Sequence, residues 1–299
     1  MEKFASRLRS GRPLVGDGGW GTMLMQHGLA AGECPESLNL TRPEVLEKIA
    51  SAYLDAGAEI ITTNTFGGSF LKLVSYDLHE QMNEINRAGA SALRKVAGDR
   101  AYVSGSCGPS GKILKPYGDA DPEELHDSFA QQVRSLVEAQ VDCICIETMV
   151  DLAEATLAIK AARSISPTIP IVATMTFEQS PRGFFTMMGN SIEQAAAGLK
   201  QAGADAIGSN CGNGIEQMVK IAAEFCTCGE LPVIIQSNAG LPRTEAGGLV
   251  YDEKPDFMAD KARELVDLGV RIIGGCCGTT PEHIQAIRQM VESSSDRSG

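Results

Sequence analysis

The stretch Val141-Asp-Cys-Ile-Cys-Ile-Glu147 is the best single guide to the fold of this chain. Its residues 143–146 are apolar on both faces of an extended strand, which is typical of a parallel strand covered by helices on both sides. The apolar run then stops at a carboxylate. It predicts a buried parallel strand whose carboxyl end carries a polar side chain.

Seven other short runs have the same form, rich in Ile and Val and ending in small or polar residues. They are Pro13–Asp17, Ala58–Asn64, Ala101–Cys107, Pro170–Thr176, Ala204–Asn210, Pro232–Asn238 and Val270–Gly275. Helix-starting pairs lie between them, such as Thr41 with Glu44, Asp151 with Glu154, and Asn190 with Glu193. Eight strand-helix units predict an α/β protein with a single-domain (β/α)8 TIM barrel, and a doubly wound open sheet is the alternative.

Composition narrows the class of protein. The chain has 299 residues, 43% of them apolar, and its 38 acidic and 26 basic residues give a net charge of −12. This balance argues against nucleic-acid binding and against a membrane surface, and the sequence contains no apolar run long enough to span a bilayer. The nine cysteines show no small disulfide framework and the N-terminus shows no signal peptide, so we expect a cytoplasmic protein. We expect one domain over residues 1–299, with its core at about 10–293 and a frayed tail at 294–299.

The residues at the strand ends should meet, because ligands bind beyond the carboxyl ends of the strands in either architecture. In chain order these residues are Asp17, Asn64, Cys107, Glu147, Thr176, Asn210 with Cys211, Asn238, and Gly275 with Cys276 and Cys277. Neither lysine nor histidine occurs in this set. A Schiff-base aldolase and a histidine-dependent acid–base enzyme are therefore both disfavoured.

Cys211, Cys276 and Cys277 are the most informative of these residues. They follow the sixth and eighth strands, which one strand separates in a barrel, so their loops can converge on one ion. Three thiolates suit Zn²⁺ and leave the fourth tetrahedral position open, as in catalytic zinc sites. A vicinal disulfide at 276–277 and three buried thiols are the alternatives.

Two acidic strand ends complete the predicted site. The stretch GDGGWG at 16–21 matches a dinucleotide-binding motif, but Asn64 stands where that motif requires an acidic residue. The glycines are better suited to a sharp turn that offers backbone N–H groups to a small anion, with Asp17 facing the pocket. Glu147 is either an acceptor for loop N–H groups or an anchor for a substrate ammonium.

Seven motifs in order carry a resemblance to the homocysteine S-methyltransferase family: GDGGWGT, TTNTFGG, SCGPSG, IETM, SNCGNG, QSNAG and GGCCGTTPEHI. The likeness runs from about residue 10 to 290 and is greatest to the homocysteine-binding domain of the cobalamin-dependent methionine synthases. It implies a (β/α)8 barrel with zinc on Cys211, Cys276 and Cys277. It also implies that Asp17 and Glu147 hold the homocysteine ammonium, that the backbone of Gly18 and Gly19 receives its carboxylate, and that Asn64, Asn210 and Asn238 support the substrate or the zinc loops.

The resemblance leaves the methyl donor open. The chain corresponds to one module of the cobalamin-dependent enzymes and lacks their D-x-H-x-x-G motif, the nearest stretch being Asp77–Met82. We expect methylcobamide carried by a separate corrinoid protein. The alternatives are a stand-alone enzyme using a sulfonium donor such as S-methylmethionine and, from another class, a hydrolase using Asp17 and Glu147 as paired carboxylates.

Overall fold

Eight parallel strands form the centre of the molecule in this computed structural model, which describes residues 2–229, 231–245 and 248–295. They are β1 (Leu14–Val15), β2 (Ile60–Thr62), β3 (Tyr102–Cys107), β4 (Cys143–Met149), β5 (Ile171–Met175), β8 (Ala206–Asn210), β9 (Val233–Ser237) and β12 (Ile272–Gly275). Each lies within, or overlaps, one of the eight predicted runs. The order is β1-β12-β9-β8-β5-β4-β3-β2, so the first strand pairs with the last.

The sheet closes between β1 and β2. An isolated parallel bridge joins Gly16 to Ile60. Beside it, the amide of Asp17 donates to the carbonyl of Ile60 at 3.1 Å, and the amide of Glu59 donates to the carbonyl of Val15 at 2.8 Å. The predicted barrel is therefore confirmed, and the open-sheet alternative is wrong.

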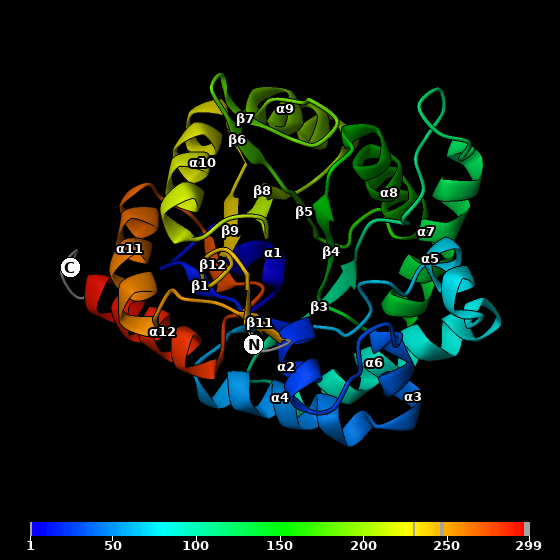
Figure 1. Cartoon of the computed structure of the whole chain (residues 1–299), viewed down its shortest axis with the longest axis horizontal. Helices are drawn as coiled ribbons and strands as arrows, with labels where there is room; N and C mark the ends of the chain where they lie inside the picture. Colours follow the sequence, from blue (N-terminus) through cyan, green and yellow to red (C-terminus); the bar gives the residue numbers. More distant parts are fainter. Residues whose placement is uncertain (1, 230, 246–247, 296–299) are drawn as a thin grey trace.

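Eight long helices surround the strands as a ring (Figure 1). They are α4 (Pro43–Asp55), α6 (Met82–Ala97), α7 (Pro122–Glu138), α8 (Leu152–Ile165), α9 (Ile192–Ala202), α10 (Ile215–Cys228), α11 (Pro255–Asp267) and α12 (Pro281–Ser295). The last helix continues two residues into the segment 294–299 that we expected to be frayed, and residues 296–299 lie outside the described residues.

Among the long helices, α7, α8 and α9 begin at a side-chain cap, and two of the predicted caps are corrected by the structure. Asp151 caps α8 as predicted, its side chain accepting from the amide of Ala153. The predicted cap at Thr41 is wrong, because Thr41 ends the short helix α3 (Leu38–Thr41) and its hydroxyl donates to the carbonyl of Ser37. The cap of α9 is Ser191, one residue after the predicted Asn190, in a capping box with Gln194.

A short N-terminal helix, α1 (Phe4–Arg7), closes the amino end of the barrel. Phe4 and Leu8 are buried in one cluster with the lower inward-facing strand residues, and the ring of Phe4 meets that of Tyr102 edge-on at 5.2 Å. This apolar plug fills the lower half of the barrel. The upper half is left for polar side chains.

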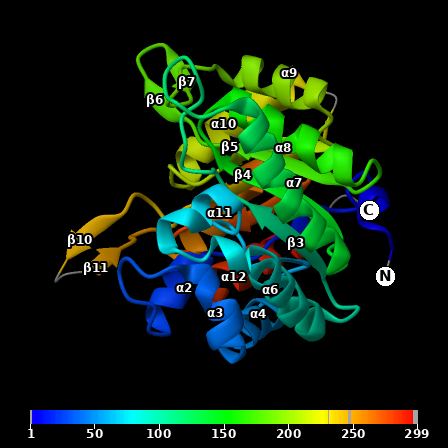
Figure 2. The same cartoon turned by 90° about the vertical axis from the view of Figure 1, so that its right-hand side faces the viewer.

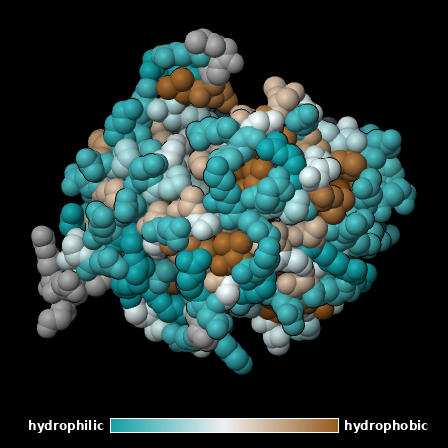
Figure 3. All heavy atoms as spheres, turned by 90° about the horizontal axis from the view of Figure 1, so that it is seen from below, coloured by the Kyte–Doolittle hydropathy of each residue, from teal (hydrophilic) through white to brown (hydrophobic). Residues whose placement is uncertain are grey.

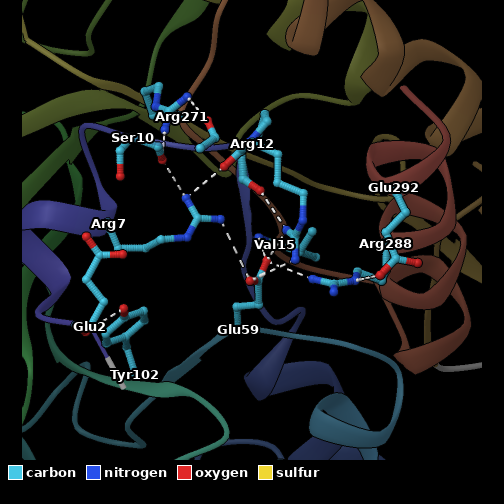
Figure 4. A network of polar contacts seen from close by, with 12 residues as sticks. Glu2, Arg7, Ser10, Arg12, Val15, Glu59, Tyr102, Arg271, Arg288 and Glu292 are labelled. Carbon is cyan, nitrogen blue, oxygen red and sulfur yellow. Dashed lines mark hydrogen bonds and ion pairs between the residues drawn. The ribbon is translucent and has the colours of Figure 1, made fainter. Parts of the chain in front are cut away.

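An arginine cluster holds this plug in place (Figure 4). Arg12 makes a two-point contact with Glu59 at 2.7 and 3.1 Å, and Arg288 of α12 reaches the same carboxylate at 2.8 Å. Arg271 donates to the carbonyls of Leu8 and Gly11 at 3.1 and 2.8 Å. Glu59 thus joins the chain before β1, the start of β2 and the last helix.

Two hairpins project from the opposite side of the barrel from the termini (Figure 2). They are β6 (Glu178–Ser180) with β7 (Gly183–Phe185), and β10 (Arg243–Glu245) with β11 (Gly248–Val250). The face in Figure 3 is mainly hydrophilic, with apolar residues in separate patches. Among the described helices, none is long and apolar enough to cross a membrane.

Candidate metal centre and substrate pocket

A cavity of about 260 Å³ opens at the carboxyl ends of the strands. Most of the predicted site residues line it, namely Asp17, Gly18, Gly19, Asn64, Glu147, Cys211, Cys276 and Cys277. Glu36 is a third acidic residue in the lining, and the described lining residues include no lysine, arginine or histidine. The cavity is thus an acidic, thiol-bearing pocket, as expected from the strand ends.

Three thiols meet at one side of this pocket. The sulfur atoms of Cys211, Cys276 and Cys277 all lie within 4.8 Å of one another, and those of Cys211 and Cys277 are 3.8 Å apart. Tetrahedral zinc with Zn–S bonds of ~2.3 Å would place two sulfur ligands about 3.8 Å apart. All nine cysteines are free thiols, so the structure gives no support to a 276–277 disulfide.

The backbone fixes these thiols in place. Cys211 follows β8 with a left-handed φ of 60°, a conformation that costs energy in a residue with a Cβ, and its amide donates to the carbonyl of Gln236 at 3.1 Å. The amide of Cys276 donates to the carbonyl of Ser237 at 2.7 Å. Both loops are therefore tied to β9, the strand between them.

Glycine is required at one point of the second loop. Gly278 has a φ of 80°, and a Cβ there would lie 2.2 Å from the ring of Tyr251. The ring therefore packs directly on the turn that carries the cysteine pair. Any larger residue at 278 would push the ring away or displace the loop.

The three thiols shift one another's pKa values. Hydrogen bonds from Cys276 and Cys277 lower the pKa of Cys211, and hydrogen bonds with Cys211 and Cys277 raise the pKa of Cys276. Close by, Oδ1 of the buried Asn238 has no hydrogen-bond partner among the described residues. Three sulfur atoms at this spacing form a donor set that a Zn²⁺ ion fits.

Asp17 is almost fully buried and is held by three donors. Its Oδ2 accepts from Nε1 of Trp20 and from the amide of Thr62, both at 2.7 Å, and its Oδ1 accepts from the Thr62 hydroxyl at 2.9 Å. Burial raises the pKa of Asp17 to about 6 in spite of these bonds. A cation in the pocket would offset that cost of burial.

Glu147 is the second pocket carboxylate. Its Oε1 accepts from the hydroxyl of Ser106, and its Oε2 lies 3.4 Å from Nδ2 of Asn210. Burial raises the pKa of Glu147 to about 7, and the charge of Asp17 adds to the shift. Both carboxylates are therefore poised to gain from an ammonium group.

Three of the groups predicted to contact or support the substrate either bind other parts of the protein or lie outside the pocket lining. Asn64 binds the protein itself, because its Nδ2 donates to the carbonyl of Pro35 and to Oδ1 of Asn39, each at 2.8 Å. The Gly19 amide already donates to the carbonyl and the hydroxyl of Thr279 at 3.1 and 3.0 Å. Among the described residues, no atom accepts a hydrogen bond from the amide of Gly18. Asn210 lies behind the pocket rather than in its lining.

Three further pocket residues, Thr62, Ser106 and Gln236, were not predicted from the sequence. Thr62 is the last residue of β2 and Ser106 is the penultimate residue of β3; both line the pocket and donate hydrogen bonds to the two carboxylates. Gln236, the penultimate residue of β9, also lines the pocket. Side chains along a strand alternate between its two faces. Counting by two residues along each predicted strand would have identified the sets of residues that share a face, one of which faces the barrel interior.

Comparisons with known proteins agree with this geometry. Residues 14–291 match the family model described as "Homocysteine S-methyltransferase". Methionine synthases from Mycobacterium leprae and Mycobacterium tuberculosis are 32% identical over 99% and 94% of the chain, which spans about 25% of their length. The metallated form of the homocysteine methyltransferase MmuM from Escherichia coli has a similar fold, with a TM-score of 0.80 at 20% identity over 96% of this chain and 99% of that one.

Proposed function

The chain belongs to the homocysteine S-methyltransferase family, and we propose on this basis that it is a zinc-dependent enzyme that transfers a methyl group to homocysteine and forms methionine. The observation that carries the proposal is the combination of three clustered thiols and two buried carboxylates around one cavity. A thiol substrate with an ammonium group complements both halves of such a pocket.

Cys211, Cys276 and Cys277 would hold the zinc ion. When bound, the ion would supply Lewis acidity that converts the substrate thiol, with an ordinary pKa near ~8.5, into the thiolate nucleophile at neutral pH. Three protein ligands leave room for one substrate sulfur. The left-handed backbone at Cys211 and the ties to β9 orient the ligands before the ion binds.

The other residues bind and orient homocysteine. Asp17 and Glu147 would accept hydrogen bonds from its ammonium, and the Gly18 amide would donate to its carboxylate. Asn64 and Asn210 would act indirectly, since their side chains hold the loop at 34–39 and the Glu147 segment. The Gly19 amide, already bonded to Thr279, would keep the Gly18 turn in shape.

For the methyl donor, we propose methylcobamide carried by a separate corrinoid protein. The identity to the two mycobacterial methionine synthases extends over almost all of this chain but only a quarter of theirs.

A cationic donor is the second candidate, favoured by one observation. Three acidic side chains, those of Asp17, Glu36 and Glu147, line the cavity, and the described lining residues include no basic side chain. Such a pocket attracts a sulfonium compound such as S-methylmethionine.

A donor panel tests these proposals together. Zinc-loaded protein is incubated with homocysteine and methylcobalamin, a methylated corrinoid protein, S-methylmethionine or glycine betaine, and methionine is measured. We expect methionine with the corrinoid donors and its loss after metal chelation. Turnover with S-methylmethionine alone would select the second donor. Hydrolase activity that survives chelation, with no methionine from any donor, would contradict the methyltransferase proposal.

A further inference from the structure

Trp20, the only tryptophan in the chain, contacts a carboxylate of the substrate pocket. It is the first residue of α2 (Trp20–Gln26) and lines the cavity together with Asp17. Its half-buried ring packs against the main hydrophobic core. Its Nε1 donates to Oδ2 of Asp17 at 2.7 Å. Packing therefore places the ring, and the ring delivers an N–H to the carboxylate that we propose binds substrate.

Asp17 is held from two elements. Thr62 of β2 donates to it through its backbone amide and its hydroxyl, at 2.7 and 2.9 Å. Trp20 donates from α2, on the far side of the Gly18-Gly19 turn. The carboxylate is thus fixed between the second strand and the helix that follows the first.

The charge of Asp17 depends on these donors. Asp17 is 1% exposed, and burial raises its pKa to about 6, whereas the hydrogen bonds from Thr62 and Trp20 lower it. The titratable groups that interact with its charge or share its cavity are Glu36, Tyr53, Cys145, Glu147 and the three clustered thiols. Since none of these groups supplies a positive charge, loss of the Trp20 bond should favour the protonated form of Asp17.

We propose that Trp20 is a positioning residue for substrate binding, whose indole N–H keeps the Asp17 carboxylate charged and fixed in place for the substrate ammonium. The inference rests on the proposed function and adds a residue to its amino-acid site. An indole N–H can only donate a hydrogen bond, so it complements the ionised carboxylate.

Two competing roles for the same contact predict different results. An indole that only anchors α2 affects every thiol that enters the pocket, at every pH. An indole that occupies an acceptor position needed by the substrate weakens binding, so its removal tightens binding. A positioning role affects only ligands with an ammonium group, and it does so most strongly near the pKa of Asp17.

Calorimetric titration of the zinc-loaded protein at pH 6 and pH 8 separates these roles. The ligands are homocysteine and 4-mercaptobutanoate, which is homocysteine without its amino group. Trp20→Phe keeps an aromatic ring and removes the N–H. Tyr53→Phe is the matched control, because it also removes an aromatic donor near the pocket, but that hydroxyl donates to the carbonyl of Thr279 at 3.1 Å. Zinc content and thermal unfolding are measured for each variant.

We expect Trp20→Phe to raise the Kd for homocysteine about fivefold at pH 6 and less than about twofold at pH 8. Wild-type Asp17 is half charged near pH 6. Loss of a hydrogen bond to a charged group would raise its pKa to about 7 and leave about a tenth of it charged at pH 6. The Kd for 4-mercaptobutanoate should change less than about twofold at either pH. Tyr53→Phe should change the Kd values of both ligands by the same factor.

Equal losses for both ligands in Trp20→Phe, a loss that is the same at both pH values, or tighter binding of homocysteine would overturn the inference alone. A wild-type protein that binds neither thiol would contradict the proposed function as well.

The wild type allows a second measurement that does not depend on the folding of the Trp20 variant. Because Trp20 is the only tryptophan, the tryptophan emission of the protein reports on this contact. The emission of the free protein should titrate with a midpoint near pH 6, as Asp17 takes up a proton, and Asp17→Asn should lack this transition. Constant emission between pH 5 and pH 8, or a transition near pH 6 that persists in Asp17→Asn, would also overturn the inference.

Discussion

Asn210 and Thr148 form a two-sided hydrogen-bonded pair across the top of the barrel. Oδ1 of Asn210 accepts from the backbone amide of Thr148, and its Nδ2 donates to the Thr148 hydroxyl, both at 2.7 Å. Thr148 has a left-handed φ of 59°, at the point where the register of β4 against β5 shifts. The asparagine thus replaces the missing strand partner at a bulge and fixes the direction of the neighbouring Glu147.

Asn210→Ala should therefore destabilise the protein and weaken substrate binding together. It leaves the Thr148 amide and the Thr174 hydroxyl without their acceptor, at a cost of about 2–4 kcal/mol. Urea unfolding and homocysteine titration measure the two effects. Asn86→Ala is the control, because Asn86 is fully buried and donates to two carbonyls away from the cavity. It should lose stability but keep its affinity, and equal binding losses in the two variants would contradict the role of Asn210.

Cys211→Ala should abolish zinc binding and methyl transfer while the barrel stays folded. The side chain is half-buried at the pocket, and its loss leaves two sulfur ligands where a catalytic zinc site needs three. Metal analysis after dialysis, methionine formation and circular dichroism check the three parts of this prediction. Cys226→Ala, on the outer helix α10, should retain zinc and activity. An active, zinc-free Cys211 variant would be incompatible with the proposed mechanism.

Gly18→Ala should lower zinc affinity and stability. A Cβ at this position would lie 2.7 Å from Oγ1 of Thr279 and 2.9 Å from the Tyr53 side chain. The Thr279 hydroxyl donates to the carbonyl of Cys276. Relief of the clash must shift the loop that carries two zinc ligands, with a loss of about 1–3 kcal/mol in unfolding free energy.

The neighbouring Gly21→Ala is the control for Gly18→Ala. A Cβ at Gly21 meets nothing within 4 Å, and the residue lies in α2 (Trp20–Gln26). Alanine there should stabilise the helix by about 0.5–1 kcal/mol and leave zinc affinity unchanged. Chemical denaturation and competition with a zinc chelator compare the pair, and similar behaviour of the two variants would contradict the steric prediction.

The stability of the protein should fall as Glu147 ionises. Burial raises its folded-state pKa to about 7, above the ordinary value of 4.5, so the folded protein binds this proton more tightly than the unfolded chain does. The unfolding free energy therefore decreases as the pH rises from about 4.5 through 7.

Glu147→Gln removes this titration. Between pH 5 and pH 8 the wild type should lose about 1–3 kcal/mol more than the variant, as measured by urea unfolding at both pH values. Asp17 titrates in both proteins, and its charge adds to the pKa shift of Glu147, so the difference between the two profiles includes the interaction of the two carboxylates. Parallel pH profiles would show that Glu147 is not held in an unfavourable charged form.

Much of the fold could be predicted because each strand lies within, or overlaps, a short apolar run. The zinc candidates were also accessible, since Cys211 and the pair at 276–277 stand directly after strands. The hydrogen bonds that Asn64 and Gly19 make within the protein were not, because they go to Pro35, Asn39 and Thr279, which only the folded chain brings near. Likewise, the cap of α9 differs by one residue because serine and asparagine are adjacent and both are good caps.

The barrel closes between β1 and β2 through few backbone contacts, and the pocket lies directly beside this closure. β1 and β2 meet through an isolated backbone bridge, yet just above it the Asp17 carboxylate takes the amide and the hydroxyl of Thr62. The Asp17 carboxylate, which would bind the ammonium group of the substrate, therefore also links β1 to β2. Asp17 therefore contributes both to ligand binding and to barrel closure. We expect the exchange rate of the Thr62 amide hydrogen to change when a ligand binds in the pocket.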